Sequence, residues 1–200
     1  MRRIVHPETI DLIVQDYRSW EPERLAESTF WKGDGMSFSA ITARAVLSEV
    51  NGRRHPHQRR LSNNALVAGA KALRKIETRI KSVRRFHELH VLIEGAFKPI
   101  RGLGELAAYD TADRIRHRLG LESEHVIYLH AGARVGARRL AGGRLPRESA
   151  WGMLKREFPQ GLRQLSTHEI EDVLCIYKDD FFVPPHEFRS RRPCCWFPVC

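Results

Sequence analysis

The sequence predicts a mostly helical fold: a compact multi-helix domain over residues 1–180, followed by a flexible, disordered tail over residues 181–200. Apolar residues recur at three- and four-residue steps through most of the chain, which is the spacing of helices with one buried face. Capping residues, glycines and prolines stand where these runs begin and end. The last 20 residues instead hold four prolines and show no apolar period. We therefore expect about eight or nine helices around one core.

Composition points to a globular protein with a polyanionic partner. The chain is 42% hydrophobic and 29% charged, which is ordinary for a globular domain. Lys and Arg number 34 against 24 Asp and Glu, so the net charge is +10. This excess favours nucleic acid as the partner, with an acidic membrane surface as the second choice.

Several classes of protein do not fit the sequence. The start of the chain has no apolar secretory core, and no run approaches the roughly 18 apolar residues of a membrane-spanning helix. Of the four cysteines, Cys175 falls in a helical pattern and the other three in the tail, without paired Cys-x-x-Cys units. We expect a cytoplasmic protein with no membrane contact, no metal and no cofactor. The sequence leaves its oligomeric state open.

Helices account for most of the first half of the chain. One begins at Pro7 and a second at Pro22, and Ser37 is placed to cap a third that stops at Asn51-Gly52. Ser62 or Asn63 is placed to cap a long helix whose apolar residues run from Leu66 to Val83.

The second half is less regular. Val126 to Leu129 is an apolar run too short to distinguish strand from helix. Gly132 and Gly136, one helical turn apart, indicate a helix packed closely against a neighbour. Residues 151–158 read as a short helix, and Thr167 is placed to cap the last one.

The stretch from Phe86 to Leu121 carries the clearest functional signal. Its apolar spacing predicts a helix that Pro99 interrupts, because proline lacks an N–H and disfavours helix at the residue before it. Gly102-Leu103-Gly104 follows, and a helical pattern resumes at Glu105. The unpaired N–H groups of a new helix can hold an anion, and Lys98 and Arg101 flank the position. A phosphate is the expected ligand.

Residues Lys98 to Gly104, followed by Leu106 and Ala107, resemble the helix-hairpin-helix motif of DNA-binding proteins. The resemblance implies a helix-hairpin-helix over residues 86–119. It also implies a grip on the DNA backbone, without sequence reading, through Lys98, Arg101, Gly102, Leu103 and Gly104. The expected partner is double-stranded DNA.

Tyr109-Asp110-Thr111 and the segment from Arg116 to Leu121 are similar to the catalytic-aspartate segment of helix-hairpin-helix DNA glycosylases. The resemblance implies base-excision chemistry in DNA repair, with Asp110 stabilising positive charge on the sugar or activating water. It covers about 25 of the chain's 200 residues together with the hairpin. Two departures from the family stand out: Asp110 follows Gly104 by only six residues, and the lysine of the bifunctional enzymes is replaced by Leu106.

Two local structures remain open for Asp110. In a continuous helix, Asp110 with Arg114 and Asp113 with His117 form i,i+4 pairs of opposite charge and have a structural role. If the helix breaks at Tyr109, Asp110 caps a new helix, which is the arrangement that the glycosylase resemblance requires.

Basic side chains extend the expected footprint. Residues 53–60 hold Arg53, Arg54, Arg59 and Arg60 with no acid, and guanidinium groups match phosphate oxygens two at a time. The exposed face of the long helix after Ser62 adds seven cations against one acid, which together with the arginines could follow one strand of a duplex.

Histidines support an alternative class of function. His130 is a second candidate for catalysis, with a core position as the other interpretation. A ribonuclease-like toxin would use His55, His57 or His130, because histidine titrates near neutral pH. A non-catalytic DNA-binding accessory protein of a mobile element is the other alternative. Residues 52–61 and 128–140 also resemble short uncharacterised bacterial proteins, which implies no activity.

Overall fold

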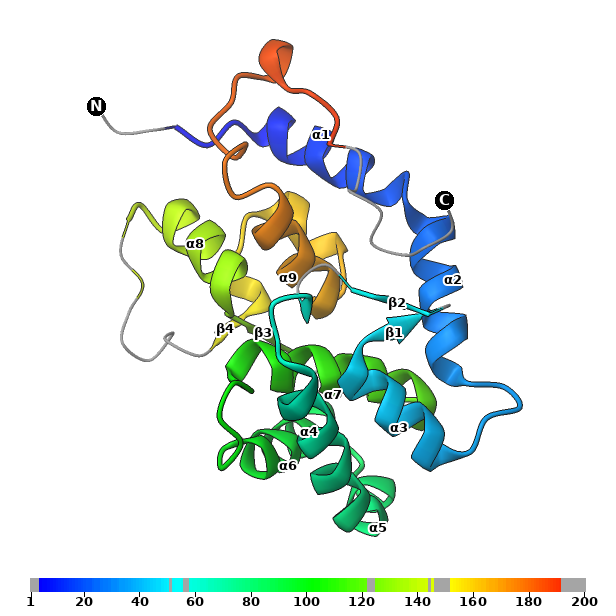
Figure 1. Cartoon of the computed structure of the whole chain (residues 1–200). Helices are drawn as coiled ribbons and strands as arrows, with labels where there is room; N and C mark the ends of the chain where they lie inside the picture. The colour runs from blue at the N-terminus through cyan, green and yellow to red at the C-terminus, as the bar shows by residue number, and fades with distance from the viewer. Residues whose placement is uncertain are drawn as a thin grey trace. The chain divides into compact units, whose positions relative to one another are not determined.

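The structure is a computed structural model, and it describes residues 4–50, 52–55, 58–121, 125–143, 145 and 152–191. These residues form nine α-helices, two small two-stranded sheets and three short 3-10 helices (Figure 1), which confirms the predicted mostly helical class. They divide into two compact units. Residues 22–121 form the central unit, and residues 4–21 and 125–191 form the terminal unit. The single-domain boundary at residue 180 stays a prediction.

The central unit is built from helices and one hairpin. Its elements are α2 (Glu21–Lys32), α3 (Phe38–Leu47), β1 (Glu49–Val50), β2 (Arg53–Arg54), α4 (Asn63–Lys75), α5 (Glu77–Ser82), α6 (Phe86–Phe97) and α7 (Glu105–Leu119). Helix α3 packs on α4 and α7, and α6 packs on α7 and α4. Trp31, Leu66, Leu73, Phe86 and Phe97 are fully buried in this unit.

Two boundaries of the central unit differ from the prediction. Helix α3 ends at Leu47 rather than at residues 51–52, because Ser48 takes a left-handed backbone with φ +55°. The chain then forms the β1–β2 hairpin, in which Val50 pairs with Arg53. The long helix after Ser62 is two helices, since Ile76 leaves helical geometry with φ −112° and ψ 15°. The predicted caps Ser37 and Ser62 are confirmed, and each hydroxyl accepts a bond from the N–H three residues on.

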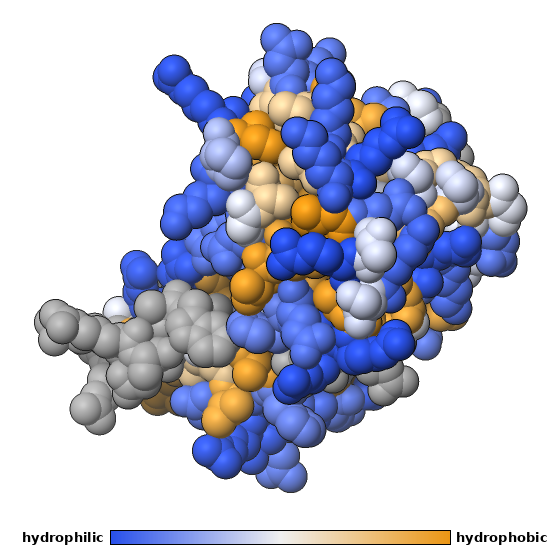
Figure 2. All heavy atoms as spheres, turned by 90° about the horizontal axis from the view of Figure 1, so that it is seen from below, coloured by the Kyte–Doolittle hydropathy of each residue, from blue (hydrophilic) through white to orange (hydrophobic). Residues whose placement is uncertain are grey.

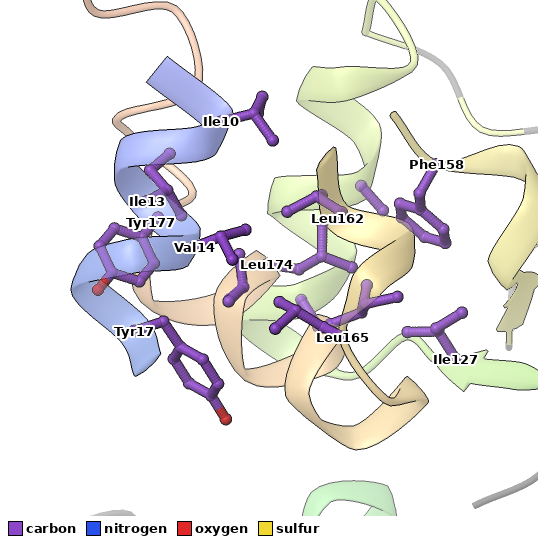
Figure 3. Close-up of a cluster of buried hydrophobic side chains, with 14 of the residues drawn as sticks. Ile10, Ile13, Val14, Tyr17, Ile127, Phe158, Leu162, Leu165, Leu174 and Tyr177 are labelled. Carbon is purple, nitrogen blue, oxygen red and sulfur yellow. The ribbon is translucent and has the colours of Figure 1, made fainter. Parts of the chain in front are cut away.

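The terminal unit surrounds one apolar cluster. Its elements are α1 (Pro7–Arg18), β3 (Val126–Tyr128), α8 (Ala131–Leu140), β4 (Gly152–Leu154), η3 (Lys155–Glu157), η4 (Gln160–Gln164), α9 (Thr167–Ile176) and η5 (Pro185–Glu187). Figure 3 shows Ile10, Ile13 and Val14 of α1 directed toward Leu162 and Leu174.

The pairing of strands β3 and β4 decides the secondary structure of two segments, residues 126–129 and residues 152–157. They pair antiparallel with Ile127 opposite Met153, so the apolar run at 126–129 begins as a strand. Residues 152–157 form β4 and η3, so the predicted helix is wrong there; residue 151 lies outside the described part. Gly152 permits this pairing, because a Cβ at that position would lie 2.8 Å from Val126 Cγ1. Helix α9 is capped by Ser166 rather than by Thr167.

The predicted close packing at the two glycines of α8 is confirmed. A Cβ added at Gly136 would lie 2.1 Å from the carbonyl oxygen of Leu174, which is far inside contact distance. One added at Gly132 would lie 2.3 Å from the sulfur of Cys175. Helix α8 therefore approaches α9 to backbone contact, and the glycines are required for it.

Residues 181–191 are fixed by contacts, so the predicted flexible tail does not begin at Phe181. Phe181 is fully buried, and the Thr9 hydroxyl donates to the Val183 carbonyl at 2.7 Å. Arg191 pairs with Asp180 at 2.6 Å. The four prolines of residues 181–200 suggested a flexible tail, and the local sequence pattern does not indicate these long-range contacts. Residues 192–200 lie outside the described part.

Few large apolar side chains are exposed in the part of the chain that the structure describes. They are Ile4, Leu25, Val67, Val91 and Val135. Figure 2 shows a face on which hydrophilic residues predominate, with apolar residues between them. No helix within the described ranges is long and apolar enough to cross a membrane.

Candidate nucleic-acid interface

The predicted helix, glycine turn and second helix are all present. Helix α6 ends at Phe97 and α7 begins at Glu105. Between them, the Ile100 N–H donates to the Phe97 carbonyl at 2.8 Å, and the Leu103 N–H donates to the Ile100 carbonyl at 3.1 Å. We call residues 98–104 the glycine turn. Its membership of the helix-hairpin-helix family stays a prediction.

Leu103 anchors the glycine turn in the core. Its side chain is only 7% exposed, and it fills the space above Gly69 of α4, where a Cβ would lie 2.7 Å from the leucine Cδ1. Gly102 has φ +100° and lies against Ala65, whose Cβ would be 3.5 Å from a Cβ at Gly102. One buried side chain and one glycine contact thus hold the turn against α4.

The rest of the turn faces solvent. Lys98, Arg101, Gly102 and Gly104 are all exposed. No ion pair holds the side chain of Lys98 or Arg101 in the part of the chain that the structure describes. Helix α7 is 15 residues long, and its first N–H groups lack acceptors within the helix and carry the positive end of its dipole. Glu105 offsets one of the two cations, so the turn stays net positive.

The arginine loop, residues 53–62, contains one structural arginine and three available ones. The Arg54 guanidinium donates to Asn63 Oδ1 at 2.7 Å and to the Leu61 carbonyl at 3.4 Å, so it ties the loop to the start of α4. Arg53, Arg59 and Arg60 are exposed and have no ion pair among the described residues. Of the predicted loop arginines, these three can therefore reach a ligand.

Gln58 fixes the arginine loop beside the glycine turn. Its side chain is 2% exposed, and its Nε2 donates to Asp110 Oδ2 on α7 at 3.3 Å. Asp110 lies about 9 Å along α7 from Gly104, at 1.5 Å per residue. At the other end of the loop the chain enters α4, and Ala65, the third residue of that helix, lies against Gly102. Arg59 and Arg60 thus lie in the chain between one residue that contacts α7 and one that contacts the glycine turn.

Asp110 lies in the middle of a continuous helix. Helix α7 runs unbroken through the buried Tyr109, so of the two local structures left open for Asp110 the continuous helix is confirmed and the break is wrong. The Asp110 side chain is 14% exposed and lies 3.9 Å from the Arg114 guanidinium, as the continuous-helix interpretation predicted. Asp113 pairs with Arg116 at 2.6 Å, and its charge also acts on His117, where it opposes the lowering of the histidine pKa by burial.

Arg114 is the buried centre of this network. It is 5% exposed, donates to the Ala45 carbonyl at 3.1 Å and lies over the Trp31 ring at 5.6 Å. Burial raises the pKa of the nearby Glu27 carboxyl, while the Trp31 N–H that it accepts and the charge of Arg114 oppose that rise. Asp110 thus supplies negative charge to a buried arginine and an acceptor to Gln58.

Sequence analysis did not single out Gln58, and it predicted Arg114 only as the i,i+4 partner of Asp110. Gln58 is the only polar residue other than histidine between the arginine pairs of the loop, which was the one available signal for it. The burial of Arg114 gave no signal, because an arginine on a helix is normally at the surface.

His130 lies in the other unit. It precedes α8, is 2% exposed, and stacks on Tyr128 with ring centroids 6.2 Å apart. This is the core position that was one of its two interpretations. The two predicted catalytic residues, Asp110 and His130, therefore belong to different compact units. His55 is partly buried at the hairpin, and His57 lies outside the described residues.

Over the described ranges, no group of three or more His, Cys, Asp or Glu side chains is placed to hold a metal ion. No family model matches the chain, and comparison with curated proteins and with solved structures gave no match.

Proposed function

We propose that the central unit binds double-stranded DNA by its phosphate backbone, through the glycine turn and the arginine loop. The observation that carries this proposal is the exposed glycine turn at the start of α7, with Lys98 and Arg101 beside it, neither of which has an ion pair among the described residues. Backbone N–H groups at a helix start bind phosphate oxygens, and two adjacent cations add attraction without reading the sequence.

Charge supports the same surface. Residues 53–101 hold 13 Lys and Arg against 3 Asp and Glu, whereas the whole chain has 34 against 24. The excess positive charge of the protein is therefore concentrated in the segment that includes the arginine loop, α4 and the glycine turn. Such a surface attracts a duplex at long range and loses affinity steeply with salt.

Gly104 offers a clean test. Its φ of −101° is open to any residue, and a Cβ there would meet nothing within 4 Å, so Gly104→Ala introduces no steric clash. Because Gly104 is the N-cap of α7 and alanine caps a helix less well than glycine, thermal unfolding of the variant is measured beside its binding. The added methyl group stands where a phosphate would approach the main chain. We expect about a tenfold or greater loss of duplex affinity, equivalent to about 1.4 kcal/mol. Fluorescence anisotropy on a 16-base-pair duplex measures it.

Gly95→Ala is the matched control. Gly95 is also exposed and a Cβ there also meets nothing within 4 Å, but it lies inside α6, where its N–H is bonded within the helix. It should bind as wild type does. Gly102 is unsuitable for this comparison, because its φ of +100° strains any side chain. Equal affinity of the Gly104→Ala and wild-type proteins would refute the glycine turn as a phosphate site.

Base-excision chemistry is not part of this proposal. The continuous α7 lacks the helix start that the glycosylase resemblance requires, and the contacts of Asp110 give it a structural role. The resemblance alone supports catalysis.

A further inference from the structure

Ser62 lies at the surface, where the arginine loop passes into α4. The residue is exposed, and its backbone is extended, with φ −68° and ψ 144°. Its Oγ accepts the Ala65 N–H at 3.2 Å and so caps the helix. An exposed serine with an extended backbone is accessible to a modifying enzyme, because neither burial nor helical geometry at the residue blocks the approach.

Two arginines precede Ser62 at short, defined spacings. Arg59 and Arg60 stand three and two residues before it, and both are exposed without an ion pair among the described residues. Serine kinases that select basic substrates hold such guanidinium groups in an acidic groove, which brings the serine hydroxyl to the phosphoryl donor. The sequence has no acid between Glu49 and Glu77 that would weaken this attraction.

The surroundings of Ser62 can accommodate a phosphate group. The Arg54 guanidinium donates to the Leu61 carbonyl at 3.4 Å and to Asn63 Oδ1 at 2.7 Å, so it contacts the residues on both sides of the serine. Ser62 also precedes the 13-residue α4, whose first N–H groups favour a negative charge. A phosphoserine at this position would therefore stabilise the helix rather than unfold it.

We propose that Ser62 is a phosphorylation site whose phosphate weakens duplex binding by the arginine loop. Ser62 Oγ attacks the γ-phosphorus of ATP, the bond from that phosphorus to ADP breaks, and the hydroxyl proton passes to the catalytic base of the kinase. This inference rests on the proposed function. A phosphoserine carries about −1.5 to −2 charges at pH 7, which offsets Arg59 and Arg60 and repels the phosphates of a duplex.

Two variants separate the effect of charge from the effect of capping. Ser62→Asp and Ser62→Asn both keep a good helix cap, because aspartate and asparagine cap helices about as well as serine, and they differ mainly by one negative charge. Both should unfold near the wild-type temperature. We expect Ser62→Asp to bind a 16-base-pair duplex at least about threefold more weakly, and Ser62→Asn to bind as wild type does.

Phosphorylation of the full chain is the direct experiment. The probe is Mg-ATP with the catalytic subunit of cyclic-AMP-dependent protein kinase, and tandem mass spectrometry locates the phosphate. We expect phosphate on Ser62, an unfolding temperature at or above that of the unmodified protein, and at least about tenfold weaker duplex binding. Ser62→Asn treated in the same way should keep its affinity. The exposed Ser190 has Glu187 and Phe188 in place of the two arginines and should receive no phosphate.

The outcomes of these experiments are distinguishable. If Ser62 stays unmodified, or Ser190 is modified as readily, the arginine pair does not mark a site and the inference is wrong. If phosphorylated and unmodified proteins bind alike while Gly104→Ala is weak, the effect of the phosphate is wrong and the proposed function stands. If Gly104→Ala also binds as wild type does, the proposed function itself fails. Weaker binding with a lower unfolding temperature would indicate unfolding of α4 and would also overturn the inference.

Discussion

Two glycines only two residues apart serve the turn for different physical reasons. Gly102 has a left-handed backbone that side chains rarely adopt, so it is required to form the turn. Gly104 has ordinary backbone geometry and open space around it, so no steric reason requires a glycine there. It is the N-cap of α7, where glycine is favoured over alanine, so a substitution at this position is read together with a stability measurement.

His90 makes the stability of the central unit depend on pH. It is 6% exposed beside Phe86 and Tyr109, and burial lowers its pKa from 6.5 to about 4. The unfolded chain then binds more protons than the folded one between these values. The stabilisation is complete above pH 6.5 and is lost as the pH falls toward 4, by up to roughly 3 kcal/mol for one such group.

We therefore expect His90→Phe to reduce the loss of stability between pH 6.5 and 4. His117, whose pKa burial also lowers to about 4, keeps part of the dependence in the same window. Urea unfolding at a series of pH values measures the slope. A slope unchanged by His90→Phe would show that His90 does not titrate with folding.

Helix α7 joins the candidate interface to the core. Its first turn presents N–H groups at the glycine turn, its middle holds Asp110 under the arginine loop, and Arg114 reaches the Ala45 carbonyl. Because one helix carries all three contacts, a movement of α7 that displaces the arginine loop would also expose Arg114.

Replacing Asp110 should therefore act through stability. Asp110→Ala removes the acceptor of Gln58 and the nearest negative charge to a buried guanidinium, and we expect a loss of about 1–3 kcal/mol in unfolding free energy. Chemical denaturation measures it. Asp113→Ala serves as the control, because its partner Arg116 is less buried and such a pair contributes less. A larger effect from Asp113 than from Asp110 would contradict the buried-network interpretation.

At the scale of the whole molecule, positive charge is unevenly divided between the two units. Residues 22–122 hold 19 Lys and Arg against 11 Asp and Glu, a net charge of +8 out of the chain's +10. The terminal unit is nearly neutral by comparison. Electrostatic attraction of a polyanion should therefore depend mainly on the central unit.

Salt titrations can test this division. Lys98→Ala with Arg101→Ala should make the slope of log affinity against log salt less steep by about 1.8, since each lost phosphate contact removes about 0.9. Arg18→Ala with Arg156→Ala removes the same charge from exposed positions of the terminal unit and should leave the slope unchanged. Equal slopes for the two double variants would mean that total charge, rather than the glycine turn, governs binding.

The sequence by itself determined most of the helices, the caps Ser37 and Ser62 and the glycine turn. These depend on neighbours a few residues apart: Ser37 and Ser62 cap their helices locally, and Gly102 is readable because a left-handed turn needs a glycine. Tertiary structure decided the rest. Whether Asp110 began a helix, whether Phe181 was buried and which arginines were free depended on contacts with residues far along the chain. No local pattern reports such contacts, because burial and charge pairing arise only when distant segments pack together.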